Sequence, residues 1–326
     1  MGLRRRSALL GLAGSVATLG IAPARGRADG WPDQPIRIVV PYPPGALTDT
    51  LGRMAGERFQ AAFGQPVIVD NKAGAGTLLG AAAVAKQPAD GYTLLLATVT
   101  TLCIAPALYA KPMATHADFT GVAKIGDVTL FLLCRASLPA TTPQELVALL
   151  RAKPAGYSYG SPGIGSAHHL LTELILSREH VSAVHGPYPG SVKALGDLTE
   201  GRLDFMFLDA TVALAQLSTG KLRALAVTGN VRLPAFPTVS ALTETFPGLD
   251  AQPWMSIAAP TGTPSPILER LNDEMNKALA DAAFASRLRR IGVEPTPLTV
   301  AAFNDFIASD AGRWAGMVKL SGAKAE

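Results

Sequence analysis

Residues 36–64 read IRIVVPYPPGALTDTLGRMAGERFQAAFG, and their pattern indicates the fold class. The β-branched run at its start predicts a buried strand, and the segment rich in Pro and Gly that follows predicts a loop. From Leu51 onward the apolar residues recur with a helical period until Gly64, a residue typical of the position after a helix end. Thr48 or Asp49 is the expected N-cap. The stretch is one strand–loop–helix unit of an α/β protein.

The same alternation of short β-branched or Leu-rich runs with helical patterns continues along the chain. It is typical of βαβ units on a mostly parallel sheet. After residue 264 the pattern becomes mainly helical. Strands are expected at residues 36–40, 67–69, 93–97, 130–134, 157–160, 181–184, 203–208 and 222–227, and helices at 143–152, 266–281, 284–291 and 299–317, with others starting near 76, 166, 191 and 211.

The length of the chain predicts two lobes, because about 300 mature residues exceed what one hydrophobic core usually serves. A helical C-terminus that packs back on the first lobe would make that lobe discontinuous. We therefore expect lobe 1 to comprise residues 29–128 plus 254–326 and lobe 2 to comprise 129–253, with a ligand cleft between them.

The first 28 residues have the pattern of a secretory signal peptide. Arg4, Arg5 and Arg6 precede an uncharged stretch, and cleavage is expected after Ala28. A transmembrane anchor is the alternative, but glycine and hydroxyl residues make the stretch weakly apolar for a span. The arginine pair also fits a twin-arginine translocase, so the Sec and Tat routes both stay open. Either route predicts a periplasmic protein.

Removal of the leader changes the charge of the protein. The full chain has 29 Lys and Arg against 25 Asp and Glu, a net charge of +4. The leader takes five arginines and no acid with it, which leaves 24 basic against 25 acidic residues, a net charge of −1. The basic balance of the precursor is therefore no argument for a nucleic-acid partner.

Cofactor and metal chemistry has little support in the sequence. Cys103 and Cys134 both lie in apolar runs, which favours two buried thiols over a disulfide, and neither has metal-ligand spacing. The segment 74–80 follows a strand and is glycine-rich, but its spacing departs from a dinucleotide-binding fingerprint. We expect no metal and no cofactor.

In open α/β sheets, ligands bind beyond the carboxyl ends of the strands. The loop 41–49 has this position, and Asp49 suits a helix cap better than a catalytic base. The segment 159–169 also has it, with Ser161 and Ser166 as hydroxyl donors, glycine N–H groups between them, and a helix that Ser166 would cap. A hydrolase with Ser166 as nucleophile is the alternative, but the nucleophile-elbow pattern is missing.

Several motifs in fixed order resemble the Bug family, the TctC-type substrate-binding proteins of tripartite tricarboxylate transport systems. The resemblance covers essentially the whole mature chain. Its motifs are Trp31-Pro32 to Arg37, Pro41 to Gly45, Gly64 to Val67, Asn71 to Gly76, Asp90 to Leu95, Tyr159 to His169, Pro187 to Gly190, Gly220 to Thr228 and Ala259 to Pro264.

This resemblance implies a periplasmic-binding-protein fold that closes on a small organic carboxylate and delivers it, as a monomer, to membrane permease subunits. A sensor that signals to a membrane partner is the alternative from another class. No catalytic residue is implied. The candidate ligand-binding residues are Tyr42, Pro43, Gly45, Ala46, Asp49, Thr77, Thr98, Ser161, Gly165, Ser166, His169 and Asp209.

Three departures from the family pattern concern the ligand. Ala46 and Leu47 follow Gly45 where a second glycine is usual, and Pro189 replaces the usual lysine of a Pro-Tyr-Lys-Gly motif. Thr77 stands where glycine is common. These departures predict a more apolar cleft wall and leave the identity of the carboxylate open.

Overall fold

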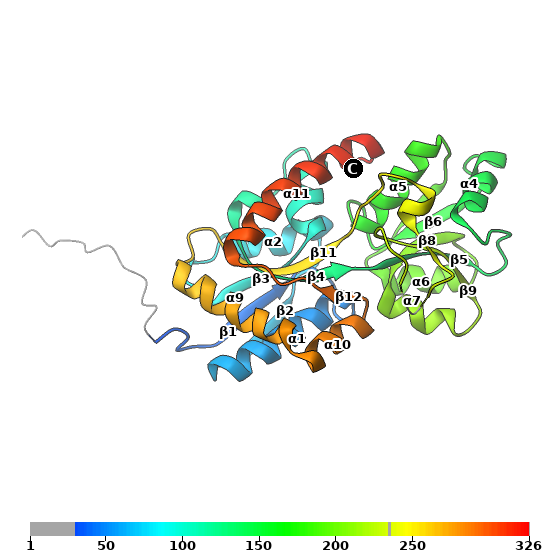
Figure 1. Ribbon diagram of the computed structural model, residues 1–326. Coiled ribbons are helices and arrows are strands. Elements are labelled where there is room, and N and C mark those ends of the chain that lie inside the picture. Colours follow the sequence, from blue (N-terminus) through cyan, green and yellow to red (C-terminus); the bar gives the residue numbers. More distant parts are fainter. Residues whose placement is uncertain (1–29, 234–235, 326) are drawn as a thin grey trace, which may run out of the picture.

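The computed structural model describes residues 30–233 and 236–325, so the signal peptide expected over 1–28 lies outside the described residues. Two α/β lobes lie side by side, each built on one sheet of six strands (Figure 1). Within the described ranges, no helix is long and apolar enough to span a membrane.

The sheet of the first lobe has the strand order β12-β4-β11-β3-β1-β2. β1 pairs in parallel with β2 and β3, whereas β11 runs antiparallel to β3 and β4. The carboxyl ends of β1 and β3 therefore point to one edge, which faces the second lobe. The strands are β1 (Ile36–Val40), β2 (Val67–Asn71), β3 (Thr93–Thr98), β4 (Phe119–Val128), β11 (Trp254–Pro260) and β12 (Val293–Pro295).

The sheet of the second lobe has the order β10-β9-β5-β8-β6-β7. β6 is parallel to β7 and β8, and β5 is antiparallel to β8 and β9. The chain passes from the first sheet to the second between Val128 and Leu130. The strands are β5 (Leu130–Arg135), β6 (Ser158–Ser161), β7 (Val184–Pro187), β8 (Phe205–Asp209), β9 (Leu222–Val227) and β10 (Ser240–Ala241).

Helices pack on both faces of each sheet (Figure 1). Those that matter for the cleft begin at the ends of the parallel strands. The α-helices are α1 (Leu47–Phe63), α2 (Leu78–Ala85), α3 (Ala105–Leu108), α4 (Pro143–Ala152), α5 (Ala167–Glu179), α6 (Ser191–Thr199), α7 (Ala210–Leu217), α8 (Leu242–Thr245), α9 (Ser265–Ala280), α10 (Ala282–Arg290) and α11 (Val300–Ser321), and a short 3-10 turn, η1 (Ala75–Thr77), precedes α2.

The expectation of mostly parallel sheets is wrong. In the second lobe the predicted strand β5 is antiparallel to both of its neighbours, and in the first lobe β4 and β11 were not predicted. Both strands are long, buried and antiparallel to a neighbour. They contain Gly, Ala, Ser and Lys, residues of low β-propensity, so their pattern does not stand out as a strand. A strand expected over 181–184 in fact begins at Val184, as β7.

The start of α1 also differs from the expectation. The helix begins at Leu47, and Ala46 is the N-cap residue with extended backbone angles and no side-chain cap. Thr48 and Asp49 are thus the second and third residues of the helix rather than its cap. The end of the helix is as predicted, with Gly64 in the left-handed conformation at φ 70°.

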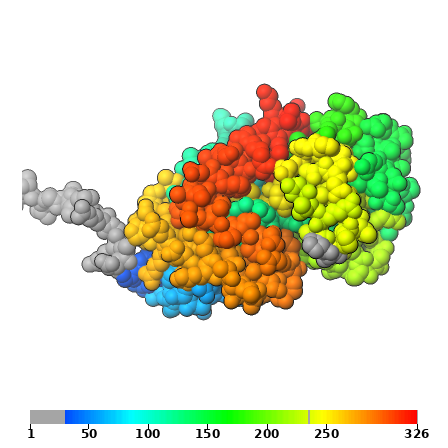
Figure 2. All heavy atoms as spheres, viewed as in Figure 1, coloured from blue at the N-terminus to red at the C-terminus, as the bar shows by residue number. Residues whose placement is uncertain are grey.

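The C-terminal helix connects the two lobes. α11 lies on the first lobe, and near its end the carbonyl of Leu320 accepts a 2.9 Å hydrogen bond from Ser177 Oγ on α5 of the second lobe. In Figure 2 the red C-terminal surface accordingly reaches the green surface of the second lobe.

The two cysteines are free and buried in the hydrophobic core, as the sequence analysis favoured. Burial raises the pKa of the Cys134 thiol to about 11, and it raises that of Cys103 as well. Neither thiol has the environment of a reactive cysteine.

Candidate functional site

Two neighbouring cavities lie between the lobes. One encloses about 440 Å³ and the other about 500 Å³. Both are lined by Tyr42 and Pro43 of the first lobe and by Pro162 and Pro189 of the second. These four residues therefore stand where the two cavities meet, and the rest of each lining is different.

The smaller cavity, here called the α1–α6 cavity, lies between two helix N-termini. Its first-lobe wall is the loop 42–46 with Leu47 and Thr48 at the start of α1, and its second-lobe wall includes residues 189–193 at the start of α6. The first-turn N–H groups of a helix have no partner within the helix, and its dipole is positive at this end. Two such ends facing one cavity favour an anionic group.

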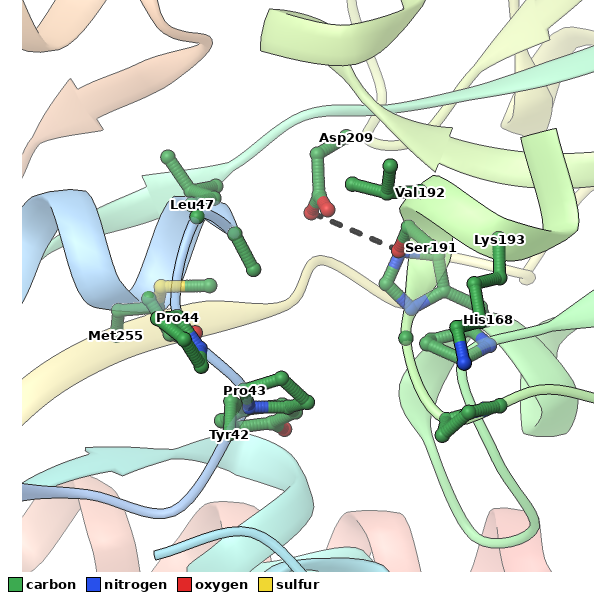
Figure 3. A pocket seen from close by; sticks show the side chains of 16 residues that line it. Tyr42, Pro43, Pro44, Leu47, His168, Ser191, Val192, Lys193, Asp209 and Met255 are labelled. Atoms are coloured by element: carbon green, nitrogen blue, oxygen red, sulfur yellow. Dashed lines mark ion pairs between the residues drawn. The ribbon is translucent and has the colours of Figure 1, made fainter. Parts of the chain in front are cut away.

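Polar side chains without partners also face the α1–α6 cavity. Asp209 stands at the end of β8, and its Oδ1 is 3.6 Å from Nε2 of His168 (Figure 3). His168 Nε2 and Thr48 Oγ1 are both buried with no hydrogen-bond partner among the described residues. On the opposite wall Leu47 and Met255 add apolar surface.

The hydroxyls of Tyr42 and Thr98 are in contact next to the α1–α6 cavity. The Tyr42 hydroxyl is 3.2 Å from Thr98 Oγ1, and Thr98 Oγ1 also accepts the N–H of Thr101. Burial raises the pKa of Tyr42 above its usual range, so its hydroxyl stays protonated. Thr98 lines neither cavity, and it acts by holding Tyr42.

Asp49 stiffens the first loop rather than lining a cavity. Its Oδ2 accepts hydrogen bonds from the Gly45 N–H and from Arg53 Nε, each at 3.1 Å. Burial by itself raises the pKa of this carboxyl, but hydrogen bonds from Arg53 and Gly45 outweigh burial and lower it. The carboxylate is therefore engaged within its own lobe.

The larger cavity, here called the α2–α5 cavity, is lined by the turn before α2 and by the loop before α5. Thr77 contributes a buried Oγ1 without a partner among the described residues. Ala75 and Thr77 have positive φ angles of 46° and 83°. Non-glycine residues in this conformation store strain, which is common at ligand sites.

Residues 161–166 between β6 and α5, here called the Gly-Ser loop, use most of their polar groups in hydrogen bonds within the loop and to α5. Ser161 Oγ accepts the Gly163 N–H, and the Gly165 N–H donates to His169 Nδ1. Ser166 caps α5 as predicted, since its Oγ accepts the His169 N–H and donates to the Gly163 carbonyl. Of the candidates Ser161, Gly165, Ser166 and His169, the structure places only Ser166 in a cavity lining.

Stacked aromatic rings pack against this loop. The rings of His169 and His185 are 4.3 Å apart at their centroids, and Tyr159 stacks on His185 at 4.7 Å. Burial, together with the neighbouring His185, lowers the pKa of His169 to about 4, and burial lowers that of His185 to about 4. Both imidazoles are neutral at pH 7, so they support the loop without adding charge to it.

The serine–histidine contacts do not form a catalytic arrangement. Ser166 Oγ contacts the backbone of His169 and not its ring. Ser161 Oγ is 2.7 Å from His185 Nε2, but Ser161 is fully buried and lines neither cavity. Across residues 30–233 and 236–325, no acid is hydrogen-bonded to the His185 ring and no cluster of side chains suits a metal ion.

Comparison with known proteins identifies the family. The family model described as "Tripartite tricarboxylate transporter family receptor", TctC, matches residues 51–322. The chain belongs to the TctC family. Protein BugT of Bordetella pertussis is 36% identical to this TctC protein over an alignment of 330 positions that covers 99% of each chain.

Two solved structures similar to this TctC protein hold dicarboxylates. R. palustris Rpa4515 with adipate matches with a TM-score of 0.86 and 32% identity, over 90% of this chain and 99% of that one. MatC (Rpa3494) from Rhodopseudomonas palustris with bound malate matches with a TM-score of 0.82 and 28% identity, over 88% and 100%. The two-lobed α/β fold is that of periplasmic binding proteins, since the structure described as periplasmic binding protein BugD is also similar, with a TM-score of 0.83.

Part of the cleft of this TctC protein was not predicted from the sequence. The structure places Tyr42, Pro43, Gly45, Ala46, Thr77, Ser166 and Asp209 in cavity linings and leaves Asp49, Thr98, Ser161, Gly165 and His169 behind them. His168, Thr48 and Ser191 line the α1–α6 cavity and were not candidates. The Pro187 to Gly190 motif was a usable signal for Ser191, because it ends where α6 begins.

Proposed function

We propose that this protein is the extracytoplasmic solute-binding component of a tripartite tricarboxylate-type transporter and captures a small organic carboxylate between its lobes. The observation that carries the proposal is the α1–α6 cavity, where helix N-termini from both lobes face one space. An anion there gains N–H donors from both sides only when the lobes are together.

The ligand carboxylate lies in this cavity, against the first turn of α1 and the first turn of α6. Tyr42, Pro43, Gly45 and Ala46 form the first-lobe wall, and Asp49 and Thr98 hold that wall in shape. The α2–α5 cavity, with Thr77 and Ser166, shares Tyr42 in its lining and receives ordered water or the far end of a longer ligand.

Capture works by hinge closure. The hinge consists of the two crossovers between lobe 1 (29–128 plus 254–326) and lobe 2 (129–253). Because ligand contacts come from both lobes, the ligand shifts the population toward the closed form. The closed form then presents the surface that the membrane subunits read, and the protein acts as a monomer after export and removal of residues 1–28.

A thermal-shift screen of organic acids on residues 29–326 tests this function, since a ligand that binds only the folded state raises Tm. We expect one or more small carboxylates to raise Tm in a dose-dependent way and neutral sugars to have no effect. A broad carboxylate panel without any shift, or a shift with sugars instead, would contradict the proposal.

The protein binds its ligand without chemical change. Support comes from Ser166, whose Oγ is committed to capping α5 and contacts no imidazole ring. Turnover of an ester, amide or acid by the purified protein that disappears in Ser166→Ala would overturn this part. A sensor would differ from a transport protein only in its membrane partner. Ligand uptake that is lost in a strain lacking the permease subunits indicates transport, and unchanged uptake indicates a sensor.

A further inference from the structure

Asp209 is an unusual group for a cleft that binds an anion. Only 6% of its surface is exposed, and it faces the α1–α6 cavity from the second lobe (Figure 3). Among the described residues its carboxylate has no hydrogen bond, and its one ion-pair contact is His168 Nε2 at 3.6 Å. A buried carboxylate without donors is costly, so its partner is expected to be the ligand.

The space between Asp209 and His168 fits one donor atom. At 3.6 Å the two groups are too far apart for a good hydrogen bond, whereas an atom about 2.8 Å from each would lie between them with normal geometry. His168 Nε2 is buried and unpartnered. A ligand group that donates to Asp209 Oδ1 and also to His168 Nε2 satisfies both, and an ammonium group has enough donors to do so.

The charge of Asp209 also favours a cationic group of the ligand at this position. Lys193 also lines the cavity, but it makes no ion pair with Asp209. A second carboxylate placed beside Asp209 would be repelled in this buried setting, whereas a cation would be attracted. The apolar wall from Leu47 and Met255 suits a methylene chain between the two ends of a ligand.

We propose that this protein selects a carboxylate whose other end is a protonated amine, with the carboxylate at the N-termini of α1 and α6 and the amine between Asp209 and His168. The proposal rests on the proposed function and narrows it. Asp209 is the residue that sets this specificity, and dicarboxylates such as the adipate held by Rpa4515 are the disfavoured class.

Isothermal titration with chain-matched ligands tests the proposal on residues 29–326. The pairs are succinate and 4-aminobutanoate, glutarate and 5-aminopentanoate, and adipate and 6-aminohexanoate. At the chain length that binds most tightly, we expect the amino acid to bind at least about tenfold more tightly than the diacid. A diacid that binds as tightly or more tightly overturns the proposal, whereas the absence of binding by every carboxylate overturns the proposed function itself.

Asp209→Asn sharpens the test, because it keeps the shape and removes the charge. We expect the preference for the amine to fall by about tenfold, with the diacid bound more tightly than by the natural protein. Asp305→Asn, on the exposed face of α11, removes the same charge elsewhere and should leave the preference unchanged. An unchanged preference in Asp209→Asn contradicts the proposal, and the titrations of the natural protein decide it even if the variant does not fold.

Discussion

The α1–α6 cavity and the α2–α5 cavity differ in where their polar groups are directed. The α1–α6 cavity has two helix N-termini without side-chain caps, an unpartnered histidine nitrogen and a carboxylate without a hydrogen-bond donor among the described residues. In the α2–α5 cavity the polar groups of the Gly-Ser loop are used in hydrogen bonds within the loop and to α5. A donor-rich sequence therefore indicates a binding site only if its donors are not already used in hydrogen bonds within the fold.

A negative charge added to one cavity and then to the other should change the affinity for a carboxylate most. Val192→Glu places a carboxylate on the first turn of α6, where Val192 is 60% exposed. We expect carboxylate affinity to fall about 30-fold through like-charge repulsion, with little loss of stability because an acid suits a helix N-terminus. Titration calorimetry measures the affinity and thermal melting the stability.

Two further substitutions make this comparison quantitative. Ile164→Glu makes the same change in the α2–α5 cavity and should weaken binding several-fold less. Val184→Glu, on the edge strand β7 and outside both cavities, is the neutral control. If Ile164→Glu reduces affinity as much as Val192→Glu, the carboxylate lies nearer the second cavity.

The stability of the protein should decrease as the pH decreases, because two histidines with lowered pKa values lie next to the Gly-Ser loop. His169 and His185 have pKa values of about 4 in the folded protein against 6.5 in the unfolded chain. Between these values the unfolded chain takes up more protons, so the free energy of unfolding decreases as pH falls from 6.5 to 4. We expect the folding equilibrium constant to drop at least about tenfold over this range.

Urea unfolding at pH 7 and at pH 4.5 measures that effect. A His185→Gln variant should show a smaller difference between the two conditions, whereas His116→Gln, at an exposed position, should behave as the natural protein. Equal stability at both pH values would show that the stacked imidazoles do not resist protonation.

The unpartnered threonines allow a smaller test of the same comparison. Thr48→Val keeps the shape and removes Oγ1 from the α1–α6 cavity, and we expect affinity to fall about fivefold, the size of one hydrogen bond. Thr77→Val does the same in the α2–α5 cavity and should change affinity less. Neither variant should lose stability, since each removes a buried hydroxyl without a partner. A larger affinity loss in Thr77→Val would reverse the order of the two cavities.

The smallest effect concerns strain in the turn before α2. Ala75 is exposed with a φ of 46°, so Ala75→Gly removes a left-handed penalty at little cost in packing. We expect the free energy of unfolding to rise by about 0.5 kcal/mol after the extra flexibility of glycine is subtracted. Ala73→Gly, where φ is not positive, should lower it, and chemical denaturation measures both. A fall with Ala75→Gly would mean that the turn carries no strain.

The features that depend on interactions between residues close together in the chain were predicted correctly from the sequence. The strand 36–40, the end of α1 at Gly64 and the Ser166 cap all follow from neighbours in the chain. The antiparallel strands β4 and β11 depend on pairing over long sequence distances, and their residues have no strong strand preference.

The candidate site was harder to predict than the fold. The loop 42–46 and Asp209 were identified and do line the α1–α6 cavity. His168 was passed over in favour of His169, because the sequence does not reveal which of two adjacent histidines faces the cleft. His169 instead points into its own lobe, where it accepts the Gly165 N–H.

The two buried thiols have a practical consequence. The chain has only two cysteines, and both are buried with raised pKa values, so neither should react with a maleimide in the folded protein at neutral pH. One cysteine placed on the surface, for example by Val192→Cys at the cleft rim, should then accept a single fluorophore. The labelled protein would be a reagentless optical sensor whose emission changes when the cleft closes on its solute.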